Sequence, residues 1–133
     1  MPNCPSVIEN RSNLQVEIQA ELKPQAQTTF GFIFQNSING KIIAKIGIDM
    51  KKQYIFAGKE KGIIPEIGNT HDFRVHLFFD KSVLEVFWND MWCVSARIFL
   101  PDPSSYQLAL FSTMSPLKVS TLDIWEISSI WSH

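Results

Sequence analysis

The sequence of 133 residues has only two cysteines, no surplus of charge of either sign and no long apolar run. Lysine and arginine number 12 against 13 acidic residues, and a net charge of −1 argues against nucleic acid or an anionic membrane as a partner. No segment approaches the ~18 apolar residues that a membrane span needs. The start of the chain lacks the basic and apolar pattern of a signal peptide, so the sequence indicates no compartment.

The cysteines and histidines do not suggest a disulfide framework or a metal site. Cys4 lies in a turn-rich segment at the start of the chain. Cys93 lies in an apolar segment, where a buried free thiol is the expected state. The histidines, His71, His76 and His133, show no ligand spacing with cysteine or carboxylate residues. The sequence therefore predicts no metal ion and no cofactor.

The composition and the spacing of apolar residues indicate a folded all-β protein. Apolar residues make up 45% of the chain, with 10 Phe and 4 Trp, which is the composition of a folded and not of a disordered protein. Period-two alternation, clearest from Leu14 to Leu22, predicts half-buried strands. About nine strands are expected, near residues 14–22, 30–34, 41–48, 53–57, 73–79, 83–89, 92–100, 106–112 and 119–130.

These strands predict one domain over residues 1–133, a two-sheet antiparallel β-sandwich of the jelly-roll or concanavalin-like class. Residues 1–10 are expected to form a loose N-terminal segment, and residues 58–69, with three glycines and a proline, to form a loop. Asn39-Gly40 predicts a tight hairpin turn, because both residues tolerate positive φ.

The hairpin from Phe73 onward contains residues that could act as a structural pair or as a turn motif. Asp80 and Ser82 flank a tight reversal, which an aspartate side chain can stabilise by accepting backbone N–H bonds. Glu85 shares a strand face with apolar neighbours, and we expect Arg97 opposite it on the next strand, forming an ion pair that stabilises the hairpin. Solvent exposure of Glu85 and a ligand role remain open alternatives.

Two tryptophans, Trp88 and Trp92, bracket the second turn of this region. Aromatic side chains dominate core and interface packing, so packing in the core or between domains is the favoured interpretation. Because flat aromatic faces also stack on sugar rings, carbohydrate binding by the two tryptophans is kept as an alternative.

The motif pattern of this region resembles a known family. The order Asp80-x-Ser82-x-x-Glu85-x-Phe87-x-Asn89, followed by Ala-Arg at 96–97, and the ending from residue 118 to 131 resemble the C-terminal β-sandwich module of glycoside hydrolase family 32. That family contains invertases, inulinases and other β-fructofuranosidases. The sequence departs from its pattern at Met91, where the family usually has glycine, and in a connection that is one residue shorter.

The resemblance implies an accessory role. In the family an N-terminal five-bladed propeller carries the catalytic residues, so no catalytic residue is predicted here and the chain alone is not expected to be an enzyme. The implied partner is a catalytic β-propeller, in cis or in trans, on which the module packs; fructan or sucrose binding and a homodimer are further implied roles. A free-standing, lectin-like carbohydrate-binding module and a structural remnant with no ligand are the alternatives.

Overall fold

The computed structural model describes residues 6–8, 15–36, 39–64, 72–80, 82–98, 106–113 and 117–126. These residues form strands and turns, and no helix among them is long and apolar enough to cross a membrane. The strands are β1 (Ser6–Ile8), β2 (Gln15–Pro24), β3 (Thr29–Asn36), β4 (Ile42–Asp49), β5 (Tyr54–Ala57), β6 (Glu60–Ile63), β7 (Phe73–Asp80), β8 (Val83–Trp88), β9 (Trp92–Arg97), β10 (Tyr106–Ser112) and β11 (Leu117–Glu126).

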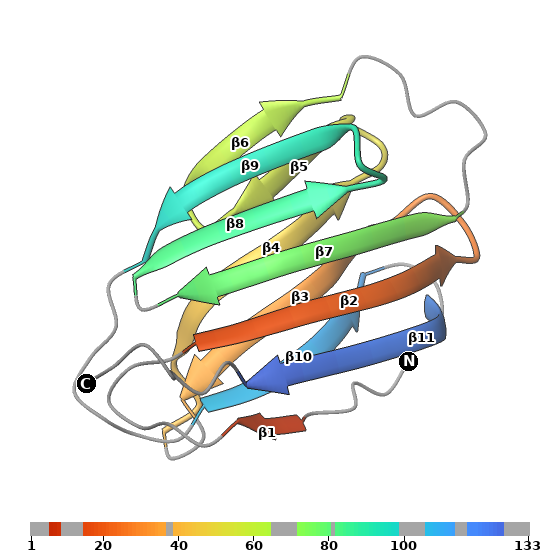
Figure 1. Ribbon diagram of the computed structural model, residues 1–133. Coiled ribbons are helices and arrows are strands. Elements are labelled where there is room, and N and C mark those ends of the chain that lie inside the picture. Colours follow the sequence, from red (N-terminus) through yellow and green to blue (C-terminus); the bar gives the residue numbers. More distant parts are fainter. Residues whose placement is uncertain are drawn as a thin grey trace.

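The strands form two stacked sheets, which confirms the predicted all-β sandwich (Figure 1). One sheet has six strands in the order β1-β10-β3-β4-β5-β6, and the other has five in the order β11-β2-β7-β8-β9. Each pair of hydrogen-bonded neighbours is antiparallel. At one side of the sandwich β9 lies close to β5 and β6 of the other sheet.

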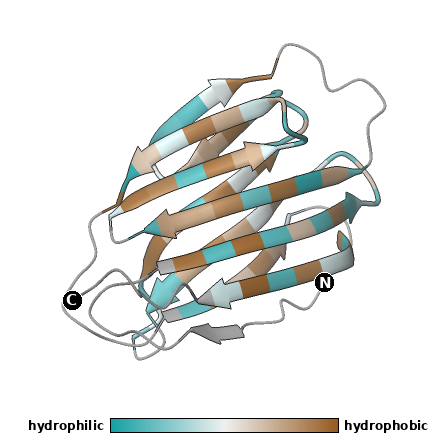
Figure 2. Cartoon of the chain, viewed as in Figure 1, coloured by the Kyte–Doolittle hydropathy of each residue, from teal (hydrophilic) through white to brown (hydrophobic). Residues whose placement is uncertain are grey.

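The hydrophobic core fills the space between the sheets and follows the alternation in the sequence. Phe73, Val75, Leu77 and Phe79 of β7 are all buried, as are the predicted neighbours on β2, such as Val16 and Ile18; Leu14 lies outside the described residues. Alternating bands of apolar and polar residues are visible along these strands (Figure 2). Because full burial of a large apolar side chain contributes about 1.5–3 kcal/mol, these rows fix which face of each strand points inward.

Aromatic rings connect the two sheets at the centre of the core. Phe30 of β3 contacts Phe73 of β7 and Trp88 of β8, with ring centroids 5.1 and 5.9 Å apart. A second pair, Phe34 and Phe79, meets edge to face at 5.2 Å. Such tilted and edge-to-face pairs add about 0.5–1.5 kcal/mol each beyond the area they bury. They therefore fix how the sheets are stacked.

On the outer side of the six-stranded sheet two glycines face each other, Gly31 of β3 and Gly47 of β4. A Cβ atom on Gly47 would lie 2.1 Å from the carbonyl oxygen of Phe30, and one on Gly31 would lie 2.0 Å from that of Ile46. The same row continues to Phe111 on one side and Phe56 on the other, and both rings are nearly buried although they face outward. The phenyl rings thus cover the sheet where side chains are missing.

Two strands lie where the sequence predicts irregular structure. β1, within the segment expected to be loose, pairs with β10 and is itself an edge strand of the six-stranded sheet. β6, within the expected loop, pairs with β5 and is the far edge of the six-stranded sheet. Its polar sequence, Glu-Lys-Gly-Ile, lacks the alternation of a half-buried strand, because an edge strand with charged residues buries little.

The glycine pair gives the first testable prediction. We expect Gly47→Ala to destabilise the protein by about 3 kcal/mol or more, because the new methyl group would overlap the backbone of β3. Urea denaturation followed by tryptophan fluorescence measures this change.

A matched control is Gly40→Asn in the β3–β4 hairpin. Gly40 has φ +72° with no atom within 4 Å of an added Cβ, and asparagine tolerates this conformation. It should lower stability by less than about 1 kcal/mol. Equal stability of the Gly47→Ala and wild-type proteins would show that the two strands do not approach as described.

Candidate functional site

The structure places Trp88 in the core and not at a sugar-binding surface, so that hypothesis is wrong for this residue. Trp88 is 0% exposed and is among the largest fully buried side chains. Its indole N–H has no hydrogen-bond partner among the described residues, which is costly, yet its ring packs against Phe30 and Phe73. Trp88 lies on the same face of β8 as Leu84 and Val86, and all three residues are buried. The alternation of apolar residues along this strand indicates the same inward face.

The turn after Trp88 uses residues other than glycine. Asn89 and Asp90 have φ values of 53° and 55°, and the amide of Met91 donates to the carbonyl of Trp88 at 3.0 Å, as in a type I′ turn. Asparagine and aspartate tolerate this region, so Met91 in place of the usual glycine does not disturb the turn. Trp92 lies opposite Trp88, half-buried against the core, and its carbohydrate role stays a prediction.

The predicted opposition of Glu85 and Arg97 is wrong by two residues. In the β8–β9 register Glu85 lies opposite Ser95, whereas Arg97 lies opposite Val83. Both charged residues are exposed on the same sheet face, and the ion pairs found among the described residues do not join them. The sequence prediction ended the first strand at residue 89, whereas β8 ends at Trp88. The loop between Trp88 and Trp92 therefore has three residues, and its length sets the register.

The remaining residues singled out in the sequence lie in the β7–β8 turn and on β9. Asp80 is the last residue of β7 and pairs with Val83, and Ser82 lies in the turn between them, where its carbonyl accepts from the amide of Ile98. Stabilisation of the turn by the Asp80 side chain stays a prediction. Cys93 is a free thiol, but it is exposed on the outer face of β9 and not buried. The described residues contain no group of three or more His, Cys, Asp or Glu side chains that could hold a metal ion.

The outer face of the five-stranded sheet carries an unusual set of side chains. Directly opposed residues share a face, and the register aligns two rows across the strands. One row is Asp123, Gln19, His76, Phe87 and Cys93, and the next is Trp125, Glu17, Phe78, Glu85 and Ser95. A solvent-facing sheet normally carries small polar and charged groups. Here aromatic rings, acids and an imidazole alternate instead.

A bulge in β11 brings its polar residues to this face. The pairing with β2 shifts between Val119 and Thr121, so Ser120 is an extra residue on β11. After the bulge Thr121 lies opposite Glu21 and Asp123 opposite Gln19. Because side chains alternate along a strand, only this insertion lets Val119 pack on the core while Thr121 turns outward.

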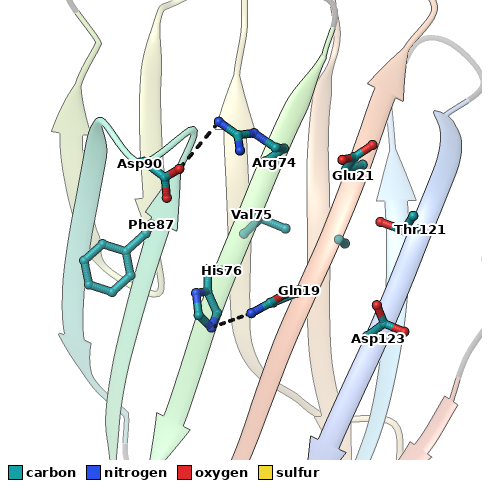
Figure 3. A pocket seen from close by; sticks show the side chains of 10 residues that line it. Gln19, Glu21, Arg74, Val75, His76, Phe87, Asp90, Thr121 and Asp123 are labelled. Carbon is teal, nitrogen blue, oxygen red and sulfur yellow. Dashed lines mark hydrogen bonds and ion pairs between the residues drawn. The ribbon is translucent and has the colours of Figure 1, made fainter.

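These residues surround a shallow hollow of about 320 Å³, termed the outer-face pocket (Figure 3). Phe87 and Asp90 border it on one side, and the buried residues Ala20 and Val75 also line it. The polar side chains come from three adjacent strands: Gln19 and Glu21 from β2, Arg74 and His76 from β7, and Thr121 and Asp123 from β11.

Contacts within the protein hold some of these groups in place. Arg74 Nη2 lies 3.5 Å from Asp90 Oδ2, and the backbone amide of Arg74 donates to Asn89 Oδ1 at 2.7 Å. His76 Nε2 lies 2.5 Å from Glu17 Oε2 and 3.3 Å from Gln19 Nε2. The Glu21 and Asp123 carboxylates, by contrast, have no hydrogen-bond or ion-pair partner within the described part of the chain.

A second hollow, of about 730 Å³, lies where the two sheets meet, at the end of the β8–β9 hairpin that is far from its turn at residues 89–91. We term it the end hollow. Ile43, Val83 and Ile98 give it an apolar lining. Lys59, Glu60 and Arg97 bring charged groups to the same hollow. Val83 is 37% exposed, so part of this apolar surface faces solvent.

Comparison with known families assigns the fold and the motifs. The family model for the C-terminal domain of family 32 glycosyl hydrolases matches residues 3–126. The chain belongs to this family. The resemblance carried by the β7–β9 motif and by the ending of the chain is therefore confirmed, and the described sandwich is a family 32 C-terminal domain.

The levanases related to this family 32 domain are longer proteins, and this chain spans about a fifth or less of their length. Its alignment with a levanase of Bacillus subtilis (strain 168) spans 148 residues at 29% identity and covers 98% of this chain and 21% of the levanase. A fructofuranosidase of Schwanniomyces occidentalis complexed with fructosylnystose matches with a TM-score of 0.72 at 13% identity, over 94% of this chain and 30% of that one. Galectin LEC-6 of Caenorhabditis elegans has a TM-score of 0.65 at 11% identity, over 94% and 90%. The structural likenesses show the fold alone.

The corrected positions give a second prediction. We expect Trp88→Ala to cost about 3–5 kcal/mol, because it leaves a cavity between the sheets, whereas Glu85→Ala should change stability by less than about 0.5 kcal/mol. Urea denaturation of both variants, monitored by circular dichroism, measures the difference. A loss above ~2 kcal/mol for Glu85→Ala would mean that its carboxylate is paired after all.

Proposed function

We propose that this family 32 domain is the accessory part of a β-fructofuranosidase-type enzyme, and that it packs on a catalytic propeller and stabilises it. The observation that carries the proposal is the family match over residues 3–126 combined with coverage of only 21% of the levanase. A domain of this size accounts for a β-sandwich but not for the five-bladed propeller that the family uses for catalysis. The same match favours this role over a free-standing lectin-like module or a remnant.

The end hollow is the surface that we propose for contact with the propeller. Protein interfaces combine an apolar centre with a polar rim. The end hollow has this composition, because its apolar residues, Val83 and Ile43 among them, lie beside Lys59, Glu60 and Arg97. Burial of Val83 by a partner would remove an apolar side chain from water, and Arg97, which lacks an ion-pair partner in the described part of the chain, could then find one.

A third prediction concerns catalysis. Purified chain should release no fructose from sucrose or from inulin, because hydrolysis of a fructoside needs an acid and a nucleophile on either side of the bond. Chromatographic measurement of free fructose tests this expectation. Release well above the rate in buffer, with activity that copurifies with the chain, would overturn the accessory role.

A fourth prediction tests the packing. In a chimaera, this chain replaces the matching segment of the Bacillus subtilis levanase. We expect the chimaera to unfold at a higher temperature than the levanase truncated before that segment, and to retain levan hydrolysis. Val83→Asp in the chimaera should lower the melting temperature by about 3 °C or more, because a carboxylate would enter the interface.

The matched control is Met91→Asp, which changes an apolar residue of the same hairpin that is 69% exposed and lies at the far end from the end hollow. It should leave the chimaera unchanged, and Val83→Asp should lower the melting temperature of the isolated chain by less than that of the chimaera. A chimaera no more stable than the truncated enzyme would contradict packing, and equal effects of both substitutions would contradict the end hollow as the contact surface.

A further inference from the structure

We propose that the outer-face pocket binds a short neutral oligosaccharide. The pocket lies on the outer face of the five-stranded sheet, whereas the side chains that form the core point to the inner face. It is also separate from the end hollow, because Asp90 and Val83 lie at opposite ends of the β8–β9 hairpin. The proposed sugar site can therefore be tested independently of propeller packing. Only the choice of fructans as first probes rests on the proposed function.

The hydrogen-bonding groups of the pocket match the hydroxyl groups of a sugar. A sugar hydroxyl donates one hydrogen bond and accepts others, so it needs both acceptors and donors. Glu21 and Asp123 offer carboxylate oxygens that the described residues leave without partners, and the Thr121 hydroxyl lies beside them (Figure 3). Across the pocket, the Arg74 guanidinium offers N–H donors, and Asp90 anchors it.

The charges of the pocket argue against other ligand classes. Glu21, Asp90 and Asp123 outnumber the single guanidinium of Arg74, so a phosphate or a uronic acid would meet a net negative surface. A bare cation would need three or more clustered ligands, and the described residues have no such group. A neutral ligand rich in hydroxyl groups is the class that remains.

Aromatic side chains form one wall of this region. Phe87 borders the pocket, and its ring meets that of Phe78 edge to face at 6.4 Å. Phe78 in turn lies 4.3 Å from the His76 ring, centroid to centroid. These rings are only half-buried on a solvent-facing sheet, where they have no core to join. The apolar C–H face of a sugar ring packs well on such surfaces, which supplies the apolar contact that hydroxyl recognition alone lacks.

The size and shape of the pocket suggest a short segment of a chain. Its volume of about 320 Å³ is at the lower end of the roughly 300–1,000 Å³ of small-molecule sites. A shallow, open pocket buries only part of its ligand. We therefore expect weak binding, with a Kd of about 1 mM.

Nuclear magnetic resonance titration of the intact, isotope-labelled chain tests the proposal. The probes are inulin-type fructo-oligosaccharides, levan-derived oligosaccharides and, as non-fructan sugars, lactose and cello-oligosaccharides. Binding of at least one probe should reach saturation and shift the amide resonances of Gln19, Glu21 and His76. Glu21→Gln should lower the affinity for that probe about tenfold, because a charged hydrogen-bond acceptor is lost. Asp123→Asn provides a second variant if Glu21→Gln alters folding.

Glu85→Gln is the matched control, because Glu85 is exposed on the same sheet face but does not line the pocket. It should leave the affinity unchanged. Saturation by a fructan alone would support the link to fructan cleavage, whereas saturation by a non-fructan sugar would keep the site and break that link. No saturation by any probe up to ~50 mM, or equal losses for Glu85→Gln and Glu21→Gln, would overturn the proposal.

Discussion

The contact of Phe30 with Phe73 and Trp88 is the interaction on which the stacking of the two sheets depends. These three rings come from both sheets, are fully buried and meet within 5.1–6.4 Å. Their volume sets the separation of the sheets, and the smaller aliphatic residues fill the remaining space. The buried indole N–H of Trp88, which has no hydrogen-bond partner among the described residues, is tolerated because the ring packing outweighs it.

The stacking leaves the two outer faces with different characters. On the six-stranded sheet Phe56 and Phe111 lie beside the opposed glycines and close the surface, and Lys45 Nζ lies 4.5 Å from the centre of the Phe111 ring. On the five-stranded sheet aromatic rings lie beside Arg74 and beside Glu21 and Asp123, two acids without a partner among the described residues, and these groups line the outer-face pocket. The proposed sugar site therefore lies on the five-stranded face, and the proposed contact with another domain lies at the end hollow.

Much of the fold could be predicted from the sequence, because alternation states directly which residues face inward. The buried rows of β2 and β7 follow this alternation. The motifs Asp80-x-Ser82 and Ala96-Arg97 indicated the correct family. The edge strands β1 and β6 could not be predicted in this way, since an edge strand gains its order from backbone pairing with a neighbour that lies far along the chain or is itself short.

The candidate sites were harder to predict, for two physical reasons. A three-residue turn fixes the β8–β9 register, and an error of two residues there separates Glu85 from Arg97. The outer-face pocket depends on strands that neighbour each other in space but not in sequence, and on the bulge at Ser120, which turns Thr121 and Asp123 outward. Alternation identified the outward side of each strand, but it carries no information on which strands lie side by side.

Amide hydrogen exchange of the chain, alone and within the levanase chimaera, is the most direct test of an accessory domain with two separate surfaces. The account predicts slower exchange in the chimaera at the end hollow, residues 58–60 and 95–98, with exchange at residues 74–76 of the outer-face pocket unchanged. Slower exchange at the outer-face pocket with no change at the end hollow would contradict it, because the sheet face assigned to sugar would then be the interface.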